Sequence, residues 1–260
     1  IQLNHFATQL HSYYTLLACY NNDKNEAGDV LMNISLNPAI ASQIHQFKIG
    51  LIHYNKIVVE QSPQMIKGRM QLFQENLFFE LEEQPVTERA GIAEWRTIWK
   101  ALGADPNRYR HSAESLMRRI RQQNYITPFH SAVDLNNFFS LRYEIPIGIY
   151  DVSKLEGDIE MTVGDAQTGY VGLNGRYNNL QNILHSRDAQ GAFGSPFVDS
   201  TRTAVTESTT EALQIFYLRP SLSVEESLKL LKSSAEMFTQ VCGGSFETAL
   251  LTSDQLFTEL

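Results

Sequence analysis

The segment from Val133 to Asp151 is the feature that most constrains how this 260-residue chain can fold. Its first part, Val133–Leu141, is apolar enough for a protein core except for a short run of polar side chains, and we predict a helix there. In that helix Asn136 and Ser140 share one face, with Asn137 beside them. The chain then passes through a proline toward a predicted strand. The segment therefore predicts hydrogen-bonding groups set directly against a core.

Four further helices in the main part of the chain are predicted from apolar residues at helical spacing: residues 63–83, 86–102, a segment that begins at Ser112, and 223–241. We expect the Ser112 hydroxyl to cap its helix, in which Glu114 and Arg118 form an i,i+4 pair. Ser223-Val224-Glu225-Glu226 is a capping box that opens the last, amphipathic helix. Gly243-Gly244 is expected to end it.

Strands are predicted where β-branched or aromatic residues alternate between turn residues: 47–60, 148–151, 159–163, 170–173 and 212–218. Helices come first, strands concentrate in the second half, and a helix closes the pattern. We therefore predict an α+β fold, a mixed or antiparallel sheet with packed helices and a C-terminal amphipathic helix.

The chain divides into two predicted parts. Residues 3–20 have helical spacing, and the polar segment 21–29 is typical of a loop. Met32 opens a fresh segment. We therefore predict an N-terminal extension over residues 1–31 and the main domain over residues 32–260.

Composition excludes several function classes. Apolar residues make up 43% of the chain, enough for a sizeable core, and the net charge of −8 argues against a protein that coats DNA or RNA. The two cysteines, Cys19 and Cys242, form no metal-binding or disulfide pattern. No apolar run approaches the ~20 residues of a membrane span. We expect a cytoplasmic protein that acts on neither DNA nor membranes, and the sequence leaves its oligomeric state open.

The basic residues are distributed unevenly. Seven of the 21 lie within 26 positions: Arg96, Lys100, Arg108, Arg110, Arg118, Arg119 and Arg121. A solvated helix face is one interpretation of such a cluster. The alternative is a surface that contacts a phosphate backbone.

A second unusual stretch combines Gly194-Ser195-Pro196 with Asp199-Ser200-Thr201-Arg202-Thr203. Small residues, an acid, hydroxyls and one arginine lie close together there. If the fold brings this stretch to the 133–151 segment, the two make a compact pocket rich in hydrogen-bond donors. Such a pocket suits a small polar ligand. Each residue can instead brace local backbone, and Arg202 can simply pair with a nearby aspartate.

The sequence lacks the motifs of several common chemistries. It contains neither GxxxxGK[ST] nor GxGxxG, the usual phosphate cradles of nucleotides, and no GxSxG nucleophile turn. Its seven histidines form no ligand spacing. We therefore expect no cofactor and no metal. What remains is a site of amides, hydroxyls and an arginine, which can orient an ester and stabilise an oxyanion.

Residues across both stretches carry a family resemblance. They are Trp99, Tyr109, Ser112, Leu116, Arg119, Val133-Asp134, Asn137, Ser140-Leu141, Pro146-Ile147-Gly148, Asp151, Gly191–Pro196 and Asp199–Thr203. Together they resemble the B3/B4 domain of the phenylalanyl-tRNA synthetase beta subunit, and most of all its freestanding versions. The resemblance covers about residues 47–222 and implies an α+β module. In the synthetase this domain hydrolyses tyrosine wrongly attached to the phenylalanine tRNA. The family's Thr-Asn pair falls at Asn136-Asn137, and its histidine falls at Gly148.

The resemblance implies a tRNA-binding, trans-editing module that hydrolyses the ester of a mischarged aminoacyl-tRNA. Asn137 and Arg202 are then the catalytic candidates. The expected contacts to the aminoacyl 3′ end are Asn136, Asn137, Ser140, Gly148, Gly194, Ser195, Asp199, Ser200, Arg202 and Thr203. The tRNA backbone is expected at Arg108, Arg110, Arg118, Arg119 and Arg121. The alternative is a non-catalytic RNA-binding or small-ligand-binding module on the same fold, which the missing histidine and the acidic charge favour.

Overall fold

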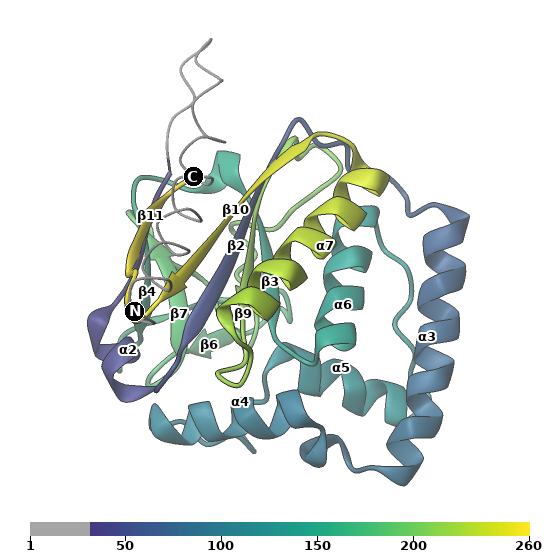
Figure 1. Ribbon diagram of the computed structural model, residues 1–260, viewed down its shortest axis with the longest axis horizontal. Helices are drawn as coiled ribbons and strands as arrows, with labels where there is room; N and C mark the ends of the chain where they lie inside the picture. The colour runs from purple at the N-terminus through teal and green to yellow at the C-terminus, as the bar shows by residue number, and fades with distance from the viewer. Residues whose placement is uncertain (1–31) are drawn as a thin grey trace, which may run out of the picture. The chain divides into compact units, whose positions relative to one another are not determined.

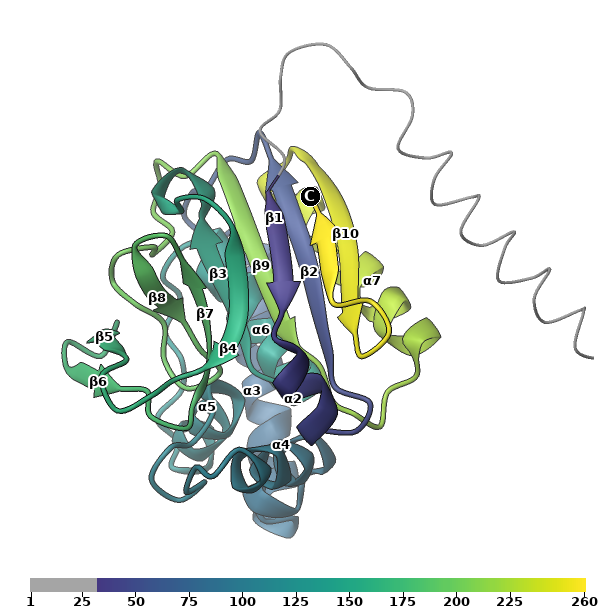
Figure 2. The ribbon, with the colours of Figure 1, turned by 90° about the vertical axis from the view of Figure 1, so that its left-hand side faces the viewer.

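The computed structural model describes residues 32–260, and the helix predicted at residues 3–20 lies outside them (Figure 1). Two sheets and a two-stranded ribbon make up the β-structure. A four-stranded antiparallel sheet has the order β10 (Ser245–Thr252), β2 (Lys48–Asn55), β9 (Glu211–Tyr217) and β3 (Ile147–Asp151). A five-stranded mixed sheet has the order β11 (Phe257–Glu259), β1 (Asn33–Leu36), β4 (Ile159–Val163), β7 (Leu184–Asp188) and β8 (Gly191–Gly194). The ribbon pairs β5 (Gly169–Val171) with β6 (Tyr177–Asn179), at one end of the molecule in Figure 2.

The six described helices accompany these sheets. They are α2 (Pro38–Gln43), α3 (Gln64–Glu83), α4 (Ala90–Ala101), α5 (Ser112–Arg121), α6 (Ser131–Tyr143) and α7 (Val224–Cys242). Short 3₁₀ turns, η1 (Val86–Glu88) and η2 (Val152–Lys154), precede α4 and follow β3. A second apolar cluster joins α3, α5 and α6, and α3 lies at the outer edge of the molecule (Figure 1). The predicted α+β class, with mixed and antiparallel sheets and packed helices, is confirmed.

The four-stranded sheet is covered on both faces. Residues directly opposite one another in an antiparallel pair point to the same face, so Ile149 and its partner Gln214 share one face while Tyr150 points to the other. The first face packs against α6 and α7, where Tyr54 stacks on Phe238 with ring centroids 4.1 Å apart. The second face meets the five-stranded sheet, where Tyr150 packs edge-on against Phe193 of β8. Strand β3 therefore separates two different environments.

Two local predictions are corrected. The helix that begins at Ser112 is capped by His111, whose Nδ1 accepts from the Glu114 amide. Full burial lowers the pKa of His111 to about 3, so this ring stays neutral and keeps a lone pair for the cap. The final helix does not close the fold, because β10 and β11 follow it. The predicted capping box of Ser223 and Glu226 is confirmed, as is the end of α7 at Gly243.

Glu114 holds α5 against α4. Its side chain is fully buried and lies 3.1 Å from Arg96 of α4 and 2.9 Å from Arg118 of its own helix. Arg96 also donates to the Pro106 carbonyl and to Asn107 in the intervening loop. The predicted Glu114–Arg118 pair is thus confirmed, within a larger cluster that positions the basic stretch.

Replacing Glu114 with alanine should lower the free energy of unfolding by about 3 kcal/mol, because a largely buried Arg96 loses its carboxylate partner. Urea denaturation followed by circular dichroism measures the change. Glu82→Ala, an exposed position on the last turn of α3, is the matched control and should change stability by less than about 0.5 kcal/mol. Equal effects of the two substitutions would contradict a structural role for the cluster.

Candidate functional site

Tyr150 is the centre of the polar cluster between the two sheets. Its side chain is fully buried, and its ring lies between the backbones of Gly148 on β3 and Gly194 on β8. A Cβ atom at Gly148 would lie 1.9 Å from the Tyr150 hydroxyl oxygen, and one at Gly194 would lie 2.2 Å from it. Real Cβ atoms do not approach that closely, so both positions require glycine while this ring is in place. The two predicted stretches therefore meet at Tyr150.

Asp199 accepts a hydrogen bond from the Tyr150 hydroxyl. Its Oδ1 accepts from Tyr150 at 2.7 Å and from the Ser195 amide at 3.3 Å. Burial raises the pKa of Asp199 to about 7, and the two hydrogen bonds offset only part of that rise. Asp199 is half-buried, and its Oδ2 has no partner among residues 32–260 and is not completely enclosed.

Two more tyrosines complete the cluster. Tyr170 of β5 donates to Ser195, and its hydroxyl also contacts the Val198 carbonyl. The Tyr217 hydroxyl lies 3.3 Å from Ser186 of β7. Burial and the nearby Asp199 raise the pKa of the Tyr150 and Tyr170 hydroxyls, so these phenols stay protonated and act as donors. Ser195 is thus braced within its own turn.

The paired amides on α6 lie on the other side of the sheet. Asn136 donates to the Ile147 carbonyl and accepts from Gln214. It therefore contacts the first face of the four-stranded sheet, the one that α6 and α7 cover. Ser140 is buried and donates to the Ile145 carbonyl. These two residues brace α6 against β3 and do not line the space around Tyr150. The predicted common pocket therefore does not include them.

Asn137 differs from its neighbour. Its side chain is half-buried and makes no hydrogen bond with any residue in the described part of the chain. It is the one amide of the predicted pair that keeps its donors and its acceptor for another molecule.

Arg202 is occupied by a structural ion pair. Both of its terminal nitrogens reach Asp188, the nearer contact being 2.8 Å, and the Asp188 carboxylate is fully buried. The guanidinium also donates to the Lys154 and Gly191 carbonyls. Arg202 therefore ties η2, β7 and the 199–203 turn together, and it does not stand free as an oxyanion donor.

The remaining residues of the turn are also mainly structural. The Ser200 hydroxyl accepts from the Arg202 amide. Thr203 is fully buried, its carbonyl accepts from the Asp151 amide, and its hydroxyl has no partner among the described residues. Of the residues predicted in this stretch, Gly194, Ser195 and Asp199 form the Tyr150 cluster directly, and the others shape its support.

Six of the seven basic residues form two groups, and the seventh, Lys100, is exposed near the end of α4. Arg96 and Arg118 are bound to Glu114, so the prediction that Arg118 contacts a phosphate backbone is not retained. Four arginines are exposed on α5 and the preceding loop and form no ion pair with residues 32–260: Arg108, Arg110, Arg119 and Arg121. These four remain available for a partner.

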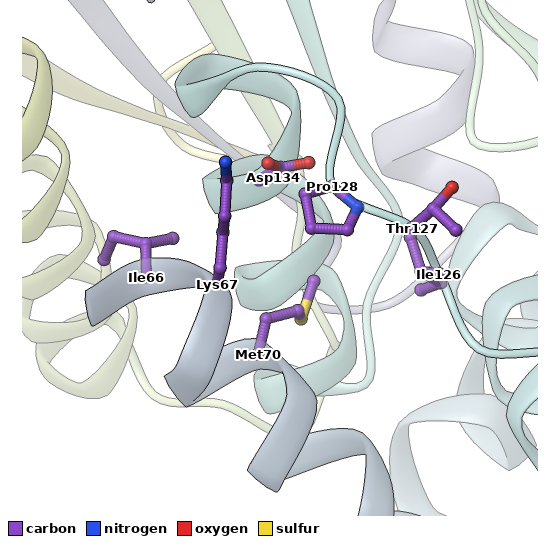
Figure 3. Close-up of a pocket in the computed structure, with 7 residues that line it drawn as sticks. All are labelled: Ile66, Lys67, Met70, Ile126, Thr127, Pro128 and Asp134. Atoms are coloured by element: carbon purple, nitrogen blue, oxygen red, sulfur yellow. The ribbon is translucent and has the colours of Figure 1, made fainter. Parts of the chain in front are cut away.

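Two surface hollows lie elsewhere. One is lined by residues of α3, the segment 126–128 and Asp134, with Lys67 extending toward that carboxylate (Figure 3). The other is lined by residues of α6, the start of α4 and the segment that leads into α7. Neither is lined by a residue predicted for the site. Within residues 32–260, no group of acids, histidines and cysteines could hold a metal ion, and no helix is long and apolar enough to cross a membrane.

A family model described as the B3/4 domain matches residues 94–241, more than half of the chain. The chain belongs to the B3/4 domain family. A protein of Bacillus subtilis (strain 168), named Uncharacterized protein YhzB, is 30% identical over 221 residues, which cover 85% of this chain and all of that protein. The match runs from within α4 to near the end of α7 and includes Tyr150 and Asp199.

One solved structure is an N-terminal fragment of the phenylalanyl-tRNA synthetase beta subunit from Pyrococcus horikoshii. It superposes with a TM-score of 0.41 and 12% sequence identity. The superposition covers 86% of this chain and 52% of the other, so the B3/4 domain protein spans about half of that fragment.

Sequence reasoning overlooked the tyrosines of this B3/4 domain. Tyr150 follows Gly148 by two residues, and that spacing puts both on one face of a strand, where the missing side chain of glycine leaves room for a ring. This signal was present in the sequence. Tyr170 and Tyr217 of the cluster, and Asp188, which pairs with Arg202, come from other strands, and no local pattern points to them.

Gly194→Ala should lower the free energy of unfolding by about 2–3 kcal/mol, because the added methyl group overlaps the Tyr150 ring. In a Tyr150→Ala background the same substitution should cost at least about 1 kcal/mol less. Denaturant unfolding of the four proteins measures the coupling. Gly68→Ala is the control, since a Cβ there meets nothing within 4 Å and α3 should gain stability. If the free-energy changes of the two single substitutions simply add in the double variant, the Tyr150 ring does not set the requirement for glycine at position 194.

Proposed function

We propose that this B3/4 domain protein binds the 3′ end of an aminoacyl-tRNA and hydrolyses its ester, with Asp199 as the general base. An unpartnered Oδ2, on a carboxyl group whose Oδ1 is fixed by Tyr150 and whose pKa is raised, is the observation that carries this proposal. A base works best when its pKa lies near the working pH, and the environment of Asp199 provides that. The family resemblance supports the choice of substrate.

The proposed reaction needs one water and no cofactor. Asp199 Oδ2 takes a proton from the water as the water oxygen bonds to the ester carbonyl carbon. When the tetrahedral intermediate collapses, the bond from that carbon to the ribose oxygen breaks, and Asp199 returns the proton to the ribose oxygen. Free amino acid and tRNA are the products. Tyr150 and the Ser195 amide keep Oδ1 fixed, so Oδ2 stays oriented through both proton transfers.

Asn137 has no hydrogen-bond partner among residues 32–260, but it lies on α6, across the sheet from Asp199, and it has no part in this proposal. Arg202 has no catalytic role here because its guanidinium is bound to Asp188. A non-catalytic binding module is the second candidate, and it is favoured by Gly148 in the place of the family histidine and by the Tyr150 ring beside it.

Asp199→Asn should reduce deacylation of a mischarged tRNA by roughly 100-fold or more, because the amide cannot accept the proton. In the native protein the rate should rise with pH through about 7, since only the ionised carboxyl acts as a base. The pH-dependent rise should be absent from the residual activity of Asp199→Asn. Release of labelled amino acid from a panel of mischarged tRNAs measures both.

Asp254→Asn, at an exposed turn, is the matched control and should keep full activity. Retained tRNA binding without any ester cleavage would select the non-catalytic module. Cleavage that Asp199→Asn leaves intact would remove the assigned base.

The four exposed arginines on α5 and its preceding loop are proposed to contact the tRNA backbone. Replacing Arg119 and Arg121 with glutamine should weaken tRNA binding and reduce the slope of log affinity against log salt by about 1.5, because two released counterions are lost. Filter binding over a salt series measures the slope. The control is Lys229→Gln with Lys232→Gln, which removes two exposed charges from α7. Equal slopes for the native and the α5 variant would contradict the proposed contact.

A further inference from the structure

The outward face of α3 carries an apolar stripe. Met65, Leu72 and Phe79 are 66%, 60% and 62% exposed, and they follow one another at intervals of seven residues. Seven residues make nearly two helical turns, so the three side chains lie along one side of the helix over about 21 Å. Isolated exposed apolar residues are common on proteins, but three that repeat at heptad spacing on one side of a helix are a candidate interaction surface.

This stripe is separate from the face by which α3 joins the core. Ile66, Met70, Leu77 and Leu81 are buried on the opposite side of the helix, so α3 is apolar on two sides. No element among residues 32–260 covers the stripe, and α3 lies at the edge of the molecule (Figure 1).

We propose that a second copy of this chain covers the stripe, with two α3 helices packed antiparallel about a two-fold axis at Leu72. A two-fold contact requires a surface that is complementary to itself. Met65 and Phe79 are equally distant from Leu72 in sequence, so the axis brings each Met65 to the partner's Phe79 and places the two Leu72 side chains together.

The charges that flank the stripe select the antiparallel arrangement. Arg69 lies in the N-terminal half of α3, and the exposed or half-buried Glu75, Glu82 and Glu83 lie in its C-terminal half. A parallel pair would put like charges side by side. An antiparallel pair puts the arginine of each copy toward the acidic half of the other.

The contact should be reversible. One helix pair buries less than the ~1,600 Å² of a typical stable interface, so the dimer should form and dissociate in the micromolar range. Over that range, sedimentation velocity should show the mass rising from 29.5 kDa toward twice that value.

Leu72→Glu should hold the protein as a monomer at every concentration, because two carboxylates would meet on the axis. Val224→Glu is the matched control: it also replaces an exposed apolar residue with an acid, at the first turn of α7 where a negative charge is favourable, and it should dimerise normally. Circular dichroism checks that both variants are folded. A native protein that stays monomeric, or a dimer that survives Leu72→Glu, overturns the proposal.

Cysteine cross-linking tests the orientation. In a Cys19→Ser background, one tagged copy carries Met65→Cys and a differently tagged copy carries Phe79→Cys. Mixing them under mild oxidation should give the mixed disulfide in excess over either homodimeric species. Predominant Met65→Cys homodimers would show parallel helices and overturn the antiparallel pairing.

Discussion

The close contact between the Tyr150 ring and two glycine backbones organises the centre of this B3/4 domain. Because Gly148 and Gly194 have no side chains, the ring fits between β3, at the edge of one sheet, and β8, at the edge of the other. Its hydroxyl then reaches Asp199 and fixes one carboxyl oxygen. Burial around the same ring keeps the pKa of that acid near neutrality. Packing and the chemistry of the proposed site therefore have a single origin.

Local signals in the sequence predicted the elements well, since they depend on neighbouring residues. The capping box at Ser223, the helix with the paired amides and the buried strand β9 are encoded within a few positions each. The site itself depends on the face of β3 to which each residue points, and that requires the pairing with β9. For this reason Asn136 and Gly148 are close in sequence but lie on opposite sides of the sheet.

Buried acids explain why the number of arginines in the sequence did not predict which of them are free to bind a partner. Glu114 is enclosed between α4 and α5 and binds two of the seven basic residues, which thereby become part of the core support. Asp188 does the same for Arg202. In both cases the acid is fully buried and its partner is drawn inward. The exposed arginines of α5 form no ion pair with residues 32–260 and are therefore the ones that remain available.

The strand order has a consequence for synthesis of the protein. Strand β10, near the C-terminal end, pairs along its whole length with β2, and β11 pairs with β1. Both sheets thus need partners separated by 190 residues or more, contacts that are slow to form. While the ribosome is still translating α7, β2 has one edge unpaired and exposed. The nascent chain therefore needs β10 and β11 to emerge from the exit tunnel before its sheets are protected from aggregation.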